Sequence, residues 1–142
     1  MHRLREAEME KLFIKGHLQP NADISAKNIE SFLKQLSAVC KMQIFFGPVV
    51  KTPDYYDEDT FKRLGNRKPR DVNAVIMWTD SGVQMYIFPE KDNWITIDIY
   101  SCKKFDKNDA LKFIIRYFDF ENDVQYATQT ADSFSQWITY KK

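Results

Sequence analysis

The sequence contains little cysteine and little histidine. Its two cysteines are Cys40 and Cys102, its two histidines are His2 and His17, and no Cys-x-x-Cys spacing occurs. These residues form no zinc-site pattern, so we expect no bound metal. No apolar run approaches the roughly 20 residues that cross a bilayer, and residues 1–10 lack the apolar centre of a secretory signal. We therefore expect a cytoplasmic protein without a membrane span or a disulfide.

Neither sign of charge dominates the chain. Lysine and arginine number 21, aspartate and glutamate number 20, and the net charge is +1. This near-balance argues against bulk electrostatic capture of nucleic acid or of an anionic membrane. A basic run in residues 62–70 could contact phosphates, but we favour a solvated loop because no nucleic-acid motif accompanies it. Its basic residues are Lys62, Arg63, Arg67, Lys68 and Arg70.

The chain has enough apolar material for one well-filled core. Hydrophobic residues make up 44% of its 142 residues and aromatic residues 15%. A chain of this length suits a single domain that buries roughly two thirds of its unfolded surface. We predict a charged arm over residues 1–10 and one domain over residues 11–142.

The spacing of apolar residues predicts the secondary structure. An amphipathic helix is predicted over residues 25–40, capped by Asp23 or Ser25, and a second helix opens at Phe105 and Asp106. Residues 51–71 lose periodicity and are predicted as one long loop with a helical turn around 60–64. Residues 131–142 are predicted as a tail. Strands are predicted over residues 11–18, 42–50, 72–79, 82–88, 94–102 and 123–128.

This order of elements, β-α-β-β-β-β-α-β, indicates the α+β class. Each amphipathic helix must cover an apolar face of the sheet. We therefore predict a two-layer α/β sandwich, with a mostly antiparallel sheet and two helices on one face.

Three segments resemble motifs of the prokaryotic S-adenosylmethionine decarboxylases. In that family an acidic residue, a serine, an aromatic-Pro-Glu and a strand ending in Asp-x-aromatic-Ser/Thr-Cys occur in this order. The resemblance covers about residues 11–128. The segments that carry it are Phe46-Gly47-Pro48-Val49, Thr79-Asp80-Ser81-Gly82 with Phe88-Pro89-Glu90, and Ile97-Asp98-Ile99-Tyr100-Ser101-Cys102.

The resemblance implies a pyruvoyl enzyme that decarboxylates S-adenosylmethionine for polyamine (spermidine) synthesis. Ser81 would be the precursor of the pyruvoyl group, and the bond from Asp80 to Ser81 would be cut autocatalytically. The ketone would act as an electron sink, and Cys102 would return a proton to the substrate carbon. Glu90 is the candidate for substrate binding. The resemblance also implies a homodimer.

Four positions depart from the family pattern. Gly82 stands where the family usually has histidine, and Tyr86 replaces the histidine that takes part in self-cleavage. Asn73 replaces a processing serine or threonine, and Lys15 replaces an acidic or amide side chain on the first strand. A phenol is a poor base near neutral pH. A second hypothesis is therefore an unprocessed relative that binds an adenosyl ligand or an active homologue in a regulatory or repurposed role.

Simpler interpretations of the same residues stay open. Asp80, Ser81 and Gly82 are ordinary residues of a hairpin turn. A cysteine such as Cys102 is often a buried, inert thiol, and Tyr86 suits a strand on packing grounds alone.

Overall fold

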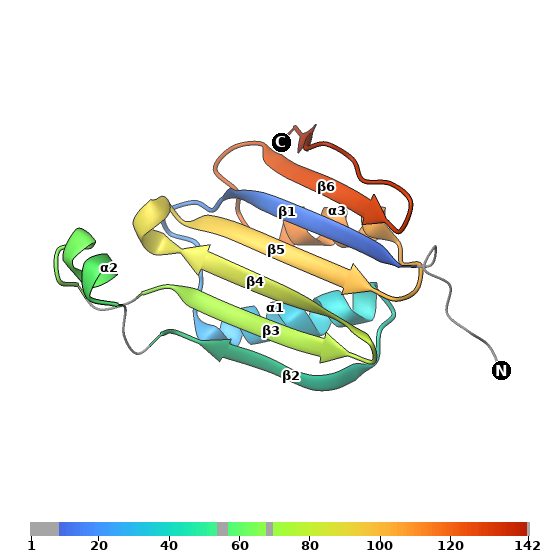
Figure 1. Ribbon diagram of the computed structural model, residues 1–142, viewed down its shortest axis with the longest axis horizontal. Helices are drawn as coiled ribbons and strands as arrows, with labels where there is room; N and C mark the ends of the chain where they lie inside the picture. Colours follow the sequence, from blue (N-terminus) through green and yellow to red (C-terminus); the bar gives the residue numbers. More distant parts are fainter. Residues whose placement is uncertain (1–8, 54–56, 68–69, 142) are drawn as a thin grey trace.

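The computed structural model describes residues 9–53, 57–67 and 70–141, and in these ranges it has one sheet and a layer of helices (Figure 1). The strands are β1 (Glu10–His17), β2 (Ile44–Lys51), β3 (Val72–Trp78), β4 (Ser81–Phe88), β5 (Trp94–Ser101), β6 (Val124–Thr130) and β7 (Ile138–Tyr140). The helices are α1 (Ala26–Val39), α2 (Glu58–Arg63), α3 (Lys107–Tyr117) and the short 3-10 turn η2 (Pro89–Lys91).

All seven strands form one sheet in the order β2-β3-β4-β5-β1-β6-β7. Every neighbouring pair is antiparallel. Figure 1 shows α1 and α3 behind one face of this sheet, while α2 lies beyond the end of the strands. The predicted two-layer α/β sandwich is confirmed. We call the uncovered side the open face.

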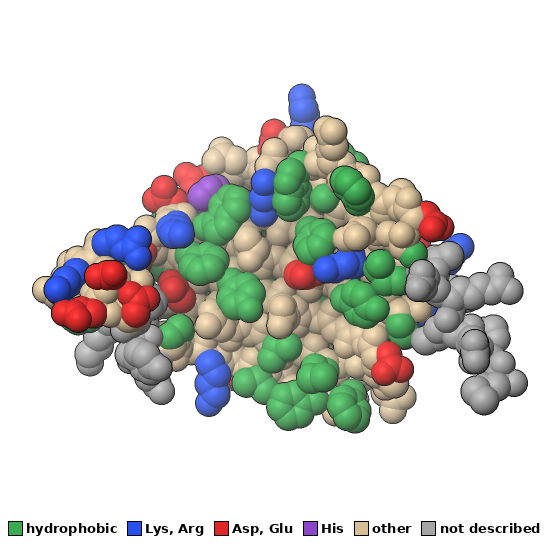
Figure 2. Space-filling view, viewed as in Figure 1, with side chains coloured by type: hydrophobic (Ala, Val, Ile, Leu, Met, Phe, Trp, Pro, Cys, Tyr) green, Lys and Arg blue, Asp and Glu red, His purple; other side chains and the backbone are tan. Residues whose placement is uncertain are grey.

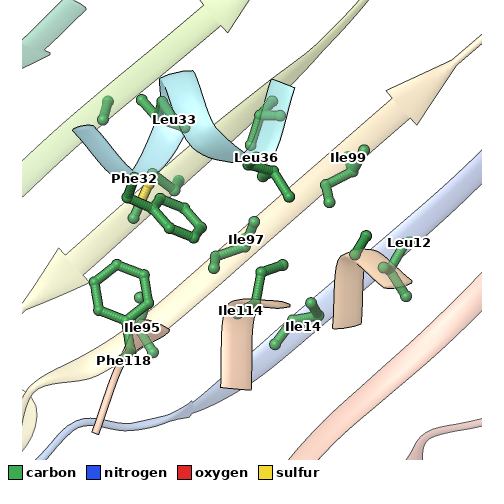
Figure 3. Packing of buried hydrophobic residues seen from close by; sticks show 14 of the residues in the cluster. Leu12, Ile14, Phe32, Leu33, Leu36, Ile95, Ile97, Ile99, Ile114 and Phe118 are labelled. Atoms are coloured by element: carbon green, nitrogen blue, oxygen red, sulfur yellow. The ribbon is translucent and has the colours of Figure 1, made fainter. Parts of the chain in front are cut away.

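The core lies between the sheet and the two long helices. Alternate residues of β1 and β5 are buried, as expected for strands with one covered face. Figure 3 shows these side chains meeting the apolar stripes of the helices. The residues that meet there include Leu12, Ile14, Ile95, Ile97, Ile99, Phe32, Leu33, Leu36, Ile114 and Phe118.

Side-chain caps set the starts of the helices. Ser25 accepts a hydrogen bond from the backbone N–H of Asn28 at 3.3 Å and begins α1, one of the two predicted caps. Asp106 caps α3 in the same way. Asp57 caps α2, so this helix spans Glu58–Arg63 and begins two residues before the predicted turn at 60–64.

The predicted tail contains a strand that the sequence did not reveal. Ile138–Tyr140 pairs with β6 as β7. A segment of three residues is too short to show the alternating pattern of a strand. It becomes a strand because it pairs with the edge strand β6.

The charged arm predicted over residues 1–10 lies mostly outside the described residues, but its last residue belongs to the sheet. Glu10 begins β1, and its carboxylate accepts a hydrogen bond from the Lys107 ammonium at 2.6 Å. The Glu10 side chain is only 9% exposed. The ion pair therefore joins the start of β1 to the first turn of α3.

Removing this buried carboxylate should cost stability. Glu10→Gln leaves the Lys107 ammonium without its counter-charge, and we expect unfolding in urea to be easier by about 2–3 kcal/mol. Glu58→Gln is the matched control, because Glu58 pairs with Lys62 on the exposed surface of α2. It should change stability by less than about 0.5 kcal/mol. Equal effects of the two variants would contradict a buried stabilising pair.

Candidate active site

Ser81 lies at the exit of a tight hairpin. It is the first residue of β4 and pairs with Trp78, the last residue of β3, so only Thr79 and Asp80 form the loop. Asp80 has a left-handed backbone with φ 57°, a conformation that aspartate tolerates better than most residues. The Asp80–Ser81 peptide bond is therefore placed in a strongly turned, surface-lying segment.

The antiparallel pairing of β4 with β5 brings Cys102 to this hairpin. Gly82 pairs with Tyr100, so the start of β4 meets the end of β5. The backbone N–H of Cys102 donates to Ser81 Oγ at 3.1 Å, and this hydroxyl lies 3.7 Å from Cys102 Sγ as its hydrogen-bond donor. Two residues far apart in the sequence thus share one partly buried site.

A buried serine holds the chain in place after β5. Ser101 is fully buried, and its hydroxyl donates to the carbonyl of Lys103. The same hydroxyl accepts a hydrogen bond from the Lys103 N–H at 3.1 Å. These bonds close a local turn around Cys102. They fix the path of the backbone at Cys102, directly after the end of β5.

Gly82 allows β3 and β4 to approach closely. A Cβ atom at this position would lie 2.7 Å from the backbone oxygen of Ile76, well inside van der Waals contact. The folded hairpin therefore requires glycine at the position where the family pattern has histidine. This physical reason for the departure was not visible in the sequence.

Asn73 and Tyr86 face each other across β3 and β4, away from Ser81. Tyr86 lies five residues along β4 from Ser81, roughly 16 Å at ~3.3 Å per residue. Its ring is partly exposed and stacks with Phe88 at 6.3 Å. Within one chain the structure does not bring these two candidate processing residues to the Ser81 hydroxyl.

Glu90 lies beyond the far end of β4. Its side chain is 16% exposed and forms ion pairs with Arg67 at 3.1 Å and Arg70 at 3.3 Å. Lys62 pairs with Glu58, so three of the basic residues of segment 62–70 have acidic partners. Lys68 lies outside the described residues. Because Ser81 begins β4 and Glu90 follows its end, the full length of β4 separates the two residues within one chain.

A family model described as S-adenosylmethionine decarboxylase matches residues 19–129. The chain belongs to the S-adenosylmethionine decarboxylase family. The match begins just after β1 and extends almost to the end of β6, so it contains both Ser81 and Cys102. Comparison with curated proteins gives no match. Enzymes of this family act on S-adenosylmethionine and use a pyruvoyl group.

The second cysteine of this family member has a different environment. Cys40 follows α1 and is buried in the core. Burial, together with the smaller effect of the nearby carboxylates Asp106 and Asp109, raises the pKa of the Cys40 thiol to about 12. Such a thiol stays protonated and inert at neutral pH. Cys102, in contrast, is only partly buried.

Sequence reasoning assigned no role to Asp98, which lines a cavity of about 300 Å³ on the open face. One carboxylate oxygen, Oδ1, is buried and has no hydrogen-bond partner among the described residues; Lys11 Nζ lies 3.8 Å from it. Burial raises the pKa of Asp98, and the Lys11 ammonium opposes this shift. The feature of the sequence that could have pointed to Asp98 is its place in the middle of a predicted strand, with an isoleucine on each side. The cavity also contains Phe13, Lys15, Tyr86 and Trp137.

The raised pKa of Asp98 predicts a pH dependence of stability. The folded chain holds this proton more tightly than the unfolded chain, so the contribution of Asp98 to stability falls as pH rises through its titration range. Asp98→Asn should therefore raise Tm at pH 7 and have little effect in acid below the unfolded pKa of about 3.9. Thermal unfolding at both pH values tests this. A variant that is less stable at pH 7 would show that the contact with Lys11 outweighs desolvation.

Lys15 points to the open face and not to the Ser81 hairpin. Its ammonium lies 3.9 Å from the ring centroid of Trp137, a cation–π distance.

In the described part of the chain, no helix is long and apolar enough to span a membrane. Across those same residues, no cluster of three or more His, Cys, Asp or Glu side chains is placed to hold a metal ion.

Proposed function

We propose that this chain is a pyruvoyl-dependent S-adenosylmethionine decarboxylase of the prokaryotic type. It cuts itself between Asp80 and Ser81 and serves polyamine (spermidine) synthesis in the cytoplasm. The observation that supports this most directly is the contact of Ser81 Oγ with the N–H and Sγ of Cys102. The family's chemistry needs a serine and a proton-donating thiol, and these two residues lie side by side.

The residues present fit the formation and use of a pyruvoyl group. Ser81 supplies the hydroxyl, and the exposed hairpin leaves the Asp80–Ser81 bond open to cleavage. Once formed, the group supplies an electron-withdrawing carbonyl to the bound amine substrate. Cys102 Sγ lies beside residue 81 and is therefore positioned to deliver a proton where the carboxylate has left.

A homodimer is the second part of the proposal. The open face exposes large apolar side chains on neighbouring strands, among them Met77, Tyr86 and Tyr100, and Figure 2 shows hydrophobic side chains spread over this face. A second copy stacked there would cover them. Stacking with the strands reversed would also bring the Glu90 end of one copy toward the Ser81 end of the other. Sedimentation of the purified protein at several concentrations tests this association.

Intact-mass measurement of freshly purified protein tests the processing. We expect two fragments, residues 1–80 and 81–142, with a pyruvoyl group at the new N-terminus, and release of carbon dioxide from S-adenosylmethionine. An active preparation that stays one 16.9 kDa chain would refute the pyruvoyl mechanism. An intact, inactive chain that binds S-adenosylmethionine in calorimetry would identify the unprocessed relative instead.

A further inference from the structure

The self-cleavage that we propose needs a proton acceptor near Ser81 Oγ. A serine hydroxyl is a weak nucleophile until a neighbouring base removes its proton. Within the described ranges, Ser81 Oγ makes its two hydrogen bonds with Cys102, accepting one from the N–H and donating one to Sγ. Tyr86, which stands at the position of the family's processing histidine, lies roughly 16 Å away along the same strand. Among the described residues, Cys102 is thus the ionisable group whose side chain is hydrogen-bonded to the hydroxyl.

We infer that Cys102 takes the proton of Ser81 during self-cleavage, in addition to its proposed part in decarboxylation. This inference depends on the proposed function. A thiolate is a competent acceptor because cysteine thiols ionise at about pH 8.5, far closer to neutrality than an aliphatic hydroxyl. The Ser81 hydroxyl donates a long hydrogen bond, 3.7 Å from oxygen to sulfur, to Cys102 Sγ. The proton donor and its acceptor are thus already paired across β4 and the end of β5, and a small approach of the two side chains brings them to transfer distance.

The backbone of Cys102 contributes a second effect. Its N–H donates to Ser81 Oγ at 3.1 Å, so it orients the oxygen and stabilises negative charge that develops there. This donor remains in any side-chain variant at position 102. Substitution of the thiol therefore separates the removal of the proton from the positioning of the hydroxyl.

The steps balance without any further reagent except water. The proton of Ser81 Oγ passes to Cys102 Sγ as Oγ bonds to the carbonyl carbon of Asp80. The C–N bond between Asp80 and Ser81 then breaks, and the freed nitrogen takes up the proton, so an ester replaces the amide. Loss of the Cα proton of residue 81 to solvent breaks its Cβ–Oγ bond, which releases Asp80 as a carboxylate and leaves an enamine. The enamine takes up a proton at Cβ to become an imine, and one water displaces ammonia from the imine to leave the pyruvoyl group.

Hydroxylamine isolates the first of these steps, because it cleaves esters far faster than amides. Freshly purified wild type, Cys102→Ala and Cys102→Ser are incubated with and without hydroxylamine, and fragments 1–80 and 81–142 are quantified by intact mass. We expect both variants to lose cleavage by about 100-fold, the size of a general-base contribution, even with hydroxylamine present. Ser fills the volume of the thiol but is a poor base, so it controls for packing.

Two further variants complete the design. Cys40→Ala removes the buried core thiol and should leave cleavage at the wild-type rate. Ser81→Cys combined with Cys102→Ala replaces the hydroxyl with a thiol that needs no base, and hydroxylamine should restore its cleavage. Thermal unfolding of each variant confirms that the comparison is made on folded protein.

The outcomes distinguish this inference from the proposed function. Equal cleavage of wild type and the Cys102 variants would overturn the inference and leave the decarboxylase proposal standing. Loss of spontaneous cleavage with hydroxylamine cleavage intact would also overturn it, since the ester would then form without the thiol. A wild type that resists cleavage under both conditions would overturn the two together.

Discussion

Ser81→Ala should leave the chain as a single species of 16.9 kDa and abolish decarboxylation of S-adenosylmethionine. Alanine has no oxygen to attack the Asp80 carbonyl, so neither the cut nor the pyruvoyl group can form. The loss should be complete, because no second route to the group exists at this position. Intact mass after prolonged incubation and release of labelled carbon dioxide measure the two effects.

Controls for this result come from the same chain. Ser31→Ala removes a hydroxyl from α1, where Ser31 contacts only Gln35 in the described hydrogen bonds, and it should be processed like wild type. Ser81→Ala removes two hydrogen bonds with Cys102 but no core side chain, so its Tm should stay within a few degrees of wild type. Activity in a folded, intact Ser81→Ala variant would refute the role of this hydroxyl.

Long apolar patterns made most of the fold predictable. The strand over Trp94–Ser101 alternates isoleucine with other residues, and α1 repeats its apolar stripe over several turns, so the local sequence already indicates which face of each is buried. The short strand β7 and helix α2 have no such repeats. β7 forms because β6 offers an edge, and α2 begins where the Asp57 carboxylate accepts the Thr60 N–H.

The candidate site was predictable in part for a related reason. The motifs around Ser81 and Cys102 mark two strand ends, and antiparallel pairing brings such ends together. The predicted strand over residues 82–88 already implied that Tyr86 lies far from Ser81, since each residue of an extended strand adds about 3.3 Å. The family motif gave its order in the sequence and not its distance from the hydroxyl.

Two features of the structure could not be predicted from the sequence. The approach of Ile76 to Gly82 depends on how closely β3 and β4 pack at the hairpin. Similarly, the burial of Asp98 Oδ1 depends on what lies around it on the open face. Both are tertiary properties, and a glycine or an aspartate in a strand pattern is compatible with several environments.

Gly82→His should destabilise the fold and fail to speed self-cleavage, although it restores the residue that the family usually has. A side chain here begins with a Cβ only 2.7 Å from a backbone oxygen of β3, and backbone cannot move aside as a flexible side chain can. Overpacking of this kind costs about 1–3 kcal/mol. We expect Gly82→His to lower the free energy of unfolding by more than Gly82→Ala does. Urea unfolding and intact mass, measured on the same preparations, test both parts.

Gln84→His is the matched control, because it places the same ring two residues further along β4 at an exposed position of the open face. It should change stability by less than about 0.5 kcal/mol. If Gly82→His were as stable as this control, β3 would have to yield at Ile76, and the glycine would not be required by the hairpin. If it were stable and also cut faster than wild type, the histidine of the family would act directly beside the serine, and the hairpin described here would be only one of its conformations.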